Sequence, residues 1–215
     1  MKTLFLSSKG LRSDIICEEF VKILPDKPKN LQLVHILTAT TPYKDEEKGF
    51  FERDRKAIKD AGFQFSELDI EGKDTEFLIK ELKDKDIIYF QGGNTFYLMK
   101  HLRLSSLDKL LPNLLDKGMI YFGTSAGSYV AGISIETGGW KKKKPQFGLT
   151  DLSGMGLVPF SMFAHYEESY NSIIRKNLKT LNHPLKVLTD NQALLVRGEK
   201  IELVGTGKEI NPAAI

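Results

Sequence analysis

The sequence is poor in cysteine, in long apolar runs and in net charge, and each shortage excludes a class of protein. Its single cysteine, Cys17, excludes an internal disulfide bond and is typical of a reducing compartment, so we expect a cytoplasmic protein. No run approaches the roughly 20 apolar residues of a membrane span, so no membrane partner is expected. The stretch MKTLFLSSKG stops being apolar at Ser7, too early for a secretory signal, and we interpret it as a first strand.

The charge is also nearly balanced. A formal net charge of +3 is too small to indicate nucleic acid as a partner, and the one dense basic run, KKKK at 141–144, is typical of a solvated loop. No internal repeat and no low-complexity linker occurs in the 215 residues, a length that suits one large core. We therefore predict a single domain over residues 1–215.

Strand and helix signals alternate along the first half of the chain. Strand-like apolar runs occur at 3–8, 31–39, 63–70, 86–93 and 118–125, and segments with helical spacing occur at 12–24, 44–61 and 74–84. This alternation predicts an α/β fold, with a mostly parallel sheet covered by helices on both faces. Beyond residue 133 we expect short strands and loops and a helix near 168–181. Strands at KVLT, ALLVRG and KIELVG follow, with RGEK as a hairpin turn.

The strand at 118–125 ends in FGTSAGS, which has the spacing of a nucleophile elbow. Gly123 and Gly127 allow a sharp turn, Ser125 projects at the start of a helix, and the N–H of Ala126 is placed to stabilise an oxyanion. The same residues suit an ordinary helix cap, because serine is a good N-cap and glycine a good turn residue. The motif alone leaves both interpretations open.

The strand at 86–93 ends in QGGNT, a second glycine-rich turn. Gly92 or Gly93 could donate the second hydrogen bond to an oxyanion, because paired glycines allow a close backbone approach. A tight turn in which Asn94 or Thr95 caps the next helix is the alternative, and one loop can do both.

A serine nucleophile needs a base, and the chain has four histidines. His35 lies in an apolar strand and is expected in the core, whereas His101 on a helix and His183 before a proline are expected at the surface. His165, in VPFSMFAHYEES, ends an apolar stretch and precedes a helix, so it is the candidate base. The pattern alone leaves a structural role for it equally open.

The base needs an acceptor that orients it. Asp190, in VLTDNQALLV, ends one strand just before the next and is the best-placed carboxylate. Asn191 beside it could orient the imidazole through its amide oxygen. The resulting order, serine, histidine and then acid, differs from that of the α/β-hydrolases.

Four blocks, YFQGGNTFYLMKHL, YFGTSAGSYVAG, FAHY and LTDNQALLV in that order, resemble the aspartyl dipeptidase (peptidase E) and cyanophycinase family of serine peptidases over nearly the whole chain. The resemblance implies a three-layer α/β/α sandwich related to class I glutamine amidotransferases, and it suggests a homodimer. It implies that Ser125 is the nucleophile and His165 the base, with Gly92 or Gly93 and Ala126 as the oxyanion hole.

The chain departs from that family at two places. Family members carry a glutamate as the third triad member, where this chain has the shorter Asp190. An acidic residue needed for activity follows the serine by about fifteen positions in the aspartyl dipeptidases, whereas here Trp140 stands near that place and Glu136 a few residues earlier. The segment after His165, YEESYNSIIRKN, has Arg175 as its only arginine. Asn94, Trp140 and Arg175 are the candidate substrate-binding residues, and strict specificity for Asp-X peptides is not expected.

The leading hypothesis is therefore a serine peptidase, similar to a dipeptidase, that cleaves short peptides through an acyl-enzyme without a metal or a cofactor. Its triad would be Ser125, His165 and Asp190, with Asn191 as the alternative third member. A catalytically degenerate family member that binds a small amino-acid ligand or acts in regulation is the second hypothesis. A transferase of acyl or amido groups is less favoured, because the elbow carries serine in place of cysteine.

Overall fold

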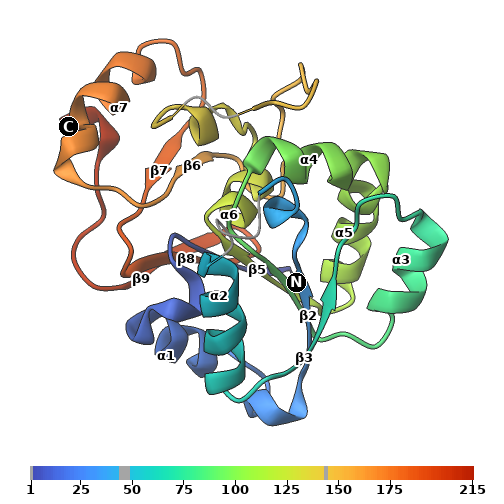
Figure 1. Ribbon diagram of the computed structural model, residues 1–215. Coiled ribbons are helices and arrows are strands. Elements are labelled where there is room, and N and C mark those ends of the chain that lie inside the picture. Colours follow the sequence, from blue (N-terminus) through green and yellow to red (C-terminus); the bar gives the residue numbers. More distant parts are fainter. Residues whose placement is uncertain (1, 44–48, 143–144) are drawn as a thin grey trace.

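The computed structural model describes residues 2–43, 49–142 and 145–215, and a seven-stranded sheet lies at its centre (Figure 1). The strand order is β3-β2-β4-β5-β1-β8-β9. The strands are β1 (Thr3–Ser7), β2 (Gln32–Ile36), β3 (Gln64–Leu68), β4 (Ile87–Phe90), β5 (Ile120–Thr124), β8 (Gln192–Arg197) and β9 (Lys200–Gly205). The first five in this order are parallel, and β8 and β9 add an antiparallel edge beside β1. The α/β class with a mostly parallel sheet is confirmed.

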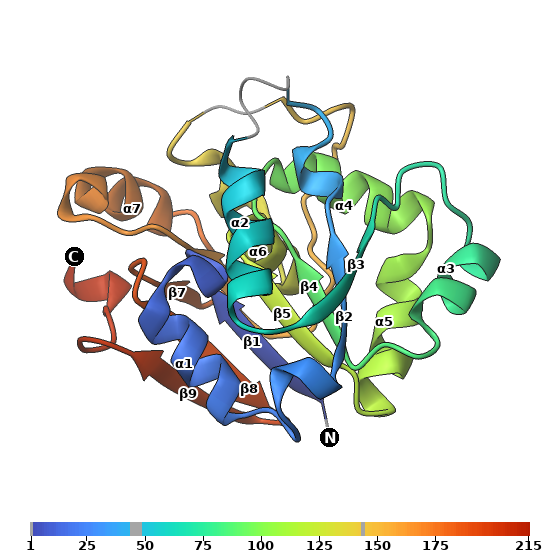
Figure 2. The same ribbon diagram turned by 60° about the horizontal axis from the view of Figure 1, so that its bottom comes forward.

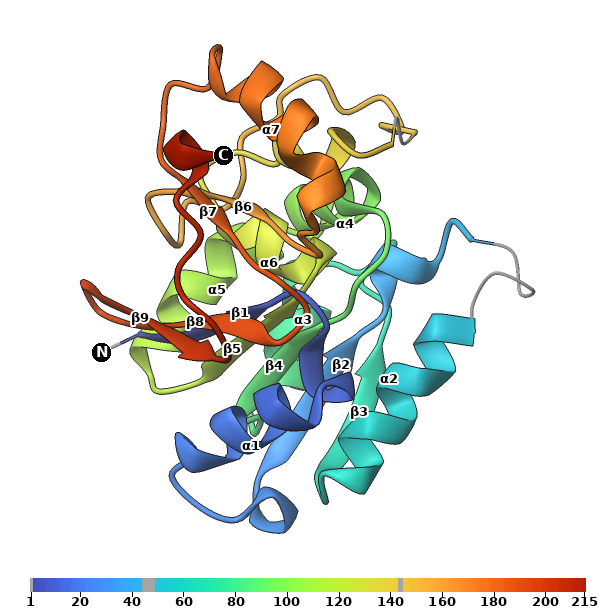
Figure 3. The same ribbon diagram turned by 90° about the vertical axis from the view of Figure 1, so that its left-hand side faces the viewer.

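Helices cover both faces of the sheet (Figures 2 and 3). They are α1 (Asp14–Lys22), α2 (Gly49–Asp60), α3 (Thr75–Leu82), α4 (Thr95–Leu104), α5 (Leu107–Asp116) and α6 (Ala126–Ala131). Side chains alternate along a strand, so Phe5 of β1 joins the core under α1 and α2, while Leu4 and Leu6 join the core under α3 to α6. Two separate apolar cores, one on each face, make the fold a three-layer sandwich.

A second, two-stranded sheet lies beside the main one. It pairs β6 (Ser161–Phe163) with β7 (Leu185–Val187) in parallel, and helix α7 (Asn171–Leu178) packs on it (Figure 1). A third apolar cluster around Phe163 and Ile174 holds these elements together. The segment that carries the candidate base begins directly after β6.

The expected strands are all present, but most are shorter than the apolar runs. The run at 31–39 ends as a strand at Ile36 and continues as a 3-10 turn over Thr38–Thr40. The hairpin is confirmed, because β8 and β9 pair antiparallel with Arg197 opposite Lys200. Helix α5 was not expected from the pattern, and residues 44–48 of the helix expected at 44–61 lie outside the described residues.

Two surface expectations are wrong, and one core expectation is confirmed. His35 is fully buried, as expected. His101 is only 7% exposed, because its ring packs on Tyr97 one turn away, with ring centroids 4.4 Å apart. The side chain of His183 is 13% exposed, and its Nε2 lies 2.7 Å from the hydroxyl of Ser161. His101 and His183 are therefore covered by contacts that the local sequence did not predict.

None of the helices in the described part of the chain is long and apolar enough to cross a membrane.

Candidate active site

Ser125 stands on a strained turn between β5 and α6, near the middle of the main sheet (Figure 1). Its backbone has φ +49° and ψ −105°, which L-residues rarely adopt. Its N–H donates to the carbonyl oxygen of Ser7 at the end of β1, at 3.0 Å. The turn is thus held by the neighbouring strand, and the serine side chain makes no capping bond to α6.

The two glycines of the elbow are needed for close packing. A Cβ on Gly127 would lie 2.4 Å from the carbonyl oxygen of Phe90, and a Cβ on Gly123 would lie 2.8 Å from the backbone of Gly127. No side chain fits in either gap. The first turn of α6 can therefore press against β4 and β5, which brings the elbow next to the loop after β4.

That loop carries the second glycine pair beside the serine. A Cβ on Gly92 would lie 3.2 Å from the Cβ of Ser125, whereas Gly93 packs on Ala39, whose carbonyl oxygen would lie 2.2 Å from an added Cβ. Among the described residues, neither the N–H of Gly92 nor that of Ala126 has a hydrogen-bond partner. Two unpaired backbone donors next to a serine side chain can stabilise a developing oxyanion.

His165 lies beyond β6 and is paired with Asp190. Its Nδ1 is 2.5 Å from Oδ1 of Asp190, and this hydrogen bond is the largest cause of the lowered pKa of that carboxyl. Asn191 does not reach the imidazole, because its Oδ1 accepts from the hydroxyl of Ser13 at 2.9 Å. Of the two candidates for orienting the base, the structure brings only Asp190 to it.

The hydroxyl of Ser125 has no hydrogen-bond partner within the described ranges. Catalytic hydrogen bonds are often long in a free enzyme and tighten when substrate binds, so this geometry is compatible with a nucleophile and its base. The imidazole has one ring nitrogen committed to Asp190, which leaves Nε2 as the atom that can exchange a proton with the serine.

Three side chains that the sequence pattern did not identify hold the loop of His165. Ser8 accepts from the N–H of His165 at 3.1 Å, and Tyr129 of α6 accepts from the N–H of Ala164 at 3.0 Å. Lys141 donates to the carbonyl oxygens of Ala164 and His165, both at 2.6 Å. The one signal in the sequence is the serine pair at 7–8, where the first apolar run stops, but the pattern does not show that Ser8 is buried.

The solvated-loop interpretation of the basic run is wrong for Lys141. Its ammonium lies 4.7 Å from the ring centre of Phe163 and 4.2 Å from that of Tyr170, in addition to its two carbonyl contacts. Such an ammonium site needs acceptors and aromatic faces that come from distant segments. Residues 143–144 of the run lie outside the described residues.

The three candidate substrate-binding residues have different places. Asn94 is buried and caps α4, because its Oδ1 accepts from the N–H groups of Phe96 and Tyr97, both at 3.0 Å. Its Nδ2 donates to the carbonyl oxygen of Pro145. The side chain is thus fully used by the fold, as the capping alternative expected.

Trp140 and Arg175 also make contacts of their own. The indole of Trp140 packs on Phe163, with ring centroids 6.1 Å apart, and Phe163 precedes the base His165 by two residues. Arg175 is exposed on α7 and donates from Nε to the carbonyl oxygen of Ile215 at 3.0 Å. The structure brings Trp140 toward the base but does not bring Arg175 to Ser125 or His165 through any contact between described residues.

Glu136, the acidic residue nearest the position that the family pattern requires, has a different neighbour. Its Oε1 accepts from the hydroxyl of Ser134 at 3.3 Å and lies 4.0 Å from Nε2 of His183.

In the described ranges, no three His, Cys, Asp or Glu side chains gather as a metal site would require.

Comparisons with known proteins agree on one family. The model of peptidase family S51 matches residues 4–204. An uncharacterized peptidase of Listeria innocua is 29% identical over 208 residues, which cover 94% of this chain and 95% of the relative. Peptidase E of a Nostoc species is 26% identical over 198 residues, covering 87% of this chain and 77% of the relative. The crystal structure of a candidate peptidase E protein from Listeria monocytogenes superposes with a TM-score of 0.83 at 26% identity, covering 96% of this chain and all of the other.

Proposed function

Because this chain belongs to peptidase family S51 and is a serine-type peptidase, we propose that it hydrolyses short peptides with Ser125, His165 and Asp190 as its catalytic triad. The observation that carries this proposal is the 2.5 Å contact between Nδ1 of His165 and Asp190, on a loop tied to the strand beside Ser125. A carboxylate at that nitrogen fixes the tautomer in which Nε2 can accept a proton.

The reaction follows from these roles. The Ser125 oxygen attacks the scissile carbonyl carbon while its proton passes to Nε2 of His165. The negative charge that develops on the carbonyl oxygen is stabilised by the N–H groups of Gly92 and Ala126. His165 then gives its proton to the leaving nitrogen, the C–N bond breaks, and an acyl-enzyme on Ser125 remains.

Water completes the cycle. His165 takes a proton from a water molecule, which attacks the acyl carbon. The bond between the acyl carbon and the Ser125 oxygen then breaks, His165 returns the proton to that oxygen, and the acid product leaves. Asp190 stabilises the imidazolium at both steps, and its lowered pKa keeps it ionised over the whole neutral range. No residue of this scheme needs an additional cofactor.

The proposed substrates are short peptides, without a strict preference for an N-terminal aspartate. Trp140 stands where the aspartyl dipeptidases carry an acidic residue, and it packs on Phe163. Arg175, the arginine nearest to the base along the chain on its C-terminal side, is bound to the backbone at Ile215. Neither contact provides a guanidinium for an aspartate side chain.

A serine-directed fluorophosphonate tests the proposal. We expect the probe to label the native protein and the Ser125→Ala variant to remain unlabelled and without hydrolytic activity on a dipeptide library. Labelling that persists in Ser125→Ala would assign the nucleophile to another residue. A native protein that neither reacts with the probe nor cleaves any dipeptide would contradict the triad and favour a ligand-binding role.

A further inference from the structure

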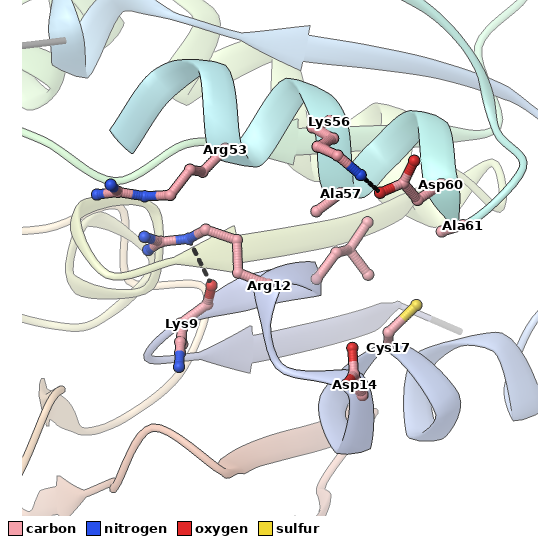
Figure 4. Close-up of a pocket in the computed structure, with 10 residues that line it drawn as sticks. Lys9, Arg12, Asp14, Cys17, Arg53, Lys56, Ala57, Asp60 and Ala61 are labelled. Carbon is pink, nitrogen blue, oxygen red and sulfur yellow. Dashed lines mark hydrogen bonds and ion pairs between the residues drawn. The ribbon is translucent and has the colours of Figure 1, made fainter. Parts of the chain in front are cut away.

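A surface hollow of about 440 Å³ opens between the segment after β1 and helix α2 (Figure 4). Six of the ten residues that line it are charged: Lys9, Arg12, Asp14, Arg53, Lys56 and Asp60. Lys56 is ion-paired with Asp60 on the same helix. In Figure 4 this pair occupies one end of the hollow, whereas the guanidinium groups of Arg12 and Arg53 point toward the other end, where Lys9 also lies.

Among the described residues, only Arg12 of these three cations has an anionic partner. Arg12 has its Nε 2.7 Å from the buried Asp54 and 3.2 Å from the carbonyl oxygen of Lys9, so the side chain is held in place. The two terminal nitrogens of Arg12 have no hydrogen-bond or ion-pair partner among the described residues, and neither do the ammonium of Lys9 and the guanidinium of Arg53. Unpaired cations in one hollow favour an anionic ligand.

The turn after β1 lines part of the hollow with Lys9 and Arg12, and it also contacts the loop of the base. Lys9 follows Ser8, the residue bonded to the N–H of His165, and the charges of Lys9 and Arg12 help to lower the pKa of Asp190 after the larger effect of the His165 hydrogen bond. The turn between them also touches the elbow, because a Cβ on Gly10 would lie 2.4 Å from the hydroxyl oxygen of Thr124. The turn that carries Lys9 and Arg12 therefore lies next to both the loop of His165 and the strand that precedes Ser125.

The histidine side is where the leaving residue of a peptide must lie. In the proposed reaction His165 protonates the leaving nitrogen, so the part of the substrate after the scissile bond extends past the imidazole. In a dipeptide that part is a single residue ending in a free carboxylate. Arginine and lysine are the side chains that bind carboxylates best.

We propose that Lys9, Arg12 and Arg53 bind the free C-terminal carboxylate of the leaving residue. This inference rests on the proposed function, and it makes the hollow the feature that selects short peptides with an uncapped C-terminus. Arg12 is the fixed member, held by Asp54 from α2. Lys9 and Arg53 approach the same ligand from the two sides of the hollow.

Paired substrates test this site. Each dipeptide that the native protein cleaves is compared with its C-terminal amide, and the readout is the ratio of kcat/KM for the acid to that for the amide. We expect a ratio of roughly tenfold to a hundredfold in the native protein, because hydrogen bonds between charged partners have this strength. The ratio should fall toward one in Lys9→Met and in Arg53→Met.

Lys59→Met is the matched control, because Lys59 is an exposed cation of the same helix that does not line the hollow. We expect it to keep the native ratio. A ratio near one in the native protein, or a native ratio in both Lys9→Met and Arg53→Met, would overturn the proposal. Because each ratio is measured within one variant, partial misfolding of that variant does not affect it.

Two further arms separate the possible failures. Dipeptides that begin with Asp or Asn test a side-chain carboxylate as the ligand, and loss of a preference for Asp in Arg53→Met with an unchanged acid-to-amide ratio would overturn the C-terminal assignment. If the native protein is labelled by the fluorophosphonate but cleaves acids and amides equally well, the carboxylate site alone is rejected. Absence of both labelling and hydrolysis would reject the proposed function, and the carboxylate site with it.

Discussion

The hydroxyl oxygen of Ser8 accepts a hydrogen bond from the N–H of His165 at 3.1 Å, across 157 positions of sequence. The same hydroxyl donates to the carbonyl oxygen of Leu188, also at 3.1 Å. Ser8 directly follows β1, the strand whose Ser7 holds the N–H of Ser125. The adjacent residues Ser7 and Ser8 thus hold the backbones of the proposed nucleophile and of the proposed base next to each other. This makes Ser8 a positioning residue.

Ser8→Ala should lower kcat by roughly tenfold to a hundredfold with little change in KM, because the loop of His165 loses its attachment to the sheet and the base shifts. Steady-state kinetics on one dipeptide measures this split. Ser105→Ala is the control, since Ser105 is a buried serine that donates to the carbonyl oxygen of His101 at 2.7 Å at the end of α4. Equal losses of kcat in the two variants would show that Ser8 acts only through stability.

Asp190→Asn should lower kcat by roughly 10²- to 10⁴-fold, because an amide cannot stabilise the imidazolium and can favour the wrong tautomer of His165. Asn191→Ala should leave kcat near its native value and reduce stability instead, since it removes only the bond to Ser13. The rate of fluorophosphonate labelling and the denaturation midpoint together separate the two effects. A larger kinetic loss in Asn191→Ala than in Asp190→Asn would reverse the assignment.

Lys141→Met should slow both hydrolysis and fluorophosphonate labelling by about tenfold. Its ammonium donates to the carbonyl oxygens of Ala164 and His165, so its loss leaves the backbone of the base without two hydrogen bonds. Methionine keeps most of the apolar stem, which limits the loss of packing. Lys142→Met is the control, because Lys142 is exposed, and a similar slowing in that variant would point to a general effect of charge.

Asp54 should make the protein less stable as the pH rises from about 4 to 7. Burial raises its pKa from an ordinary 3.8 to about 7, and the nearby Arg12, which lowers it, offsets only part of this effect. The native carboxyl therefore keeps a proton that the unfolded chain releases. The stabilisation that this proton gives is complete below about pH 4. It decreases as the pH rises and is gone above about pH 7, with a slope of at most ~1.4 kcal/mol per pH unit.

Urea unfolding of the native protein and of Asp54→Asn at several pH values measures this slope. The difference between their free energies of unfolding should change in favour of the variant as the pH rises. Arg12→Met is the complementary variant, because it removes the only cation that contacts Asp54 among the described residues. A difference that favours the native protein more strongly at high pH would mean that the ion pair with Arg12 outweighs burial.

Local sequence determined the parts of this protein that depend on a few neighbouring residues. The alternation of apolar runs and helical segments specifies the three-layer sandwich, because parallel strands need helices on both faces. The glycines around Ser125 specify the elbow, since only a residue without a side chain fits between α6 and the sheet. The sequence likewise predicted the glycine turn at 91–95 and Asn94 as a candidate cap of the next helix.

Only the tertiary structure decided which side chains meet. Asp190 and Asn191 are adjacent in the sequence, yet one contacts His165 and the other Ser13, because the turn before β8 directs their side chains to different neighbours. Ser8 and Lys141 reach the loop of His165 from distant segments, and their roles depend on how the fold brings these segments together. The identity of each residue is local, but the distance between two residues far apart in the chain is a property of the fold alone.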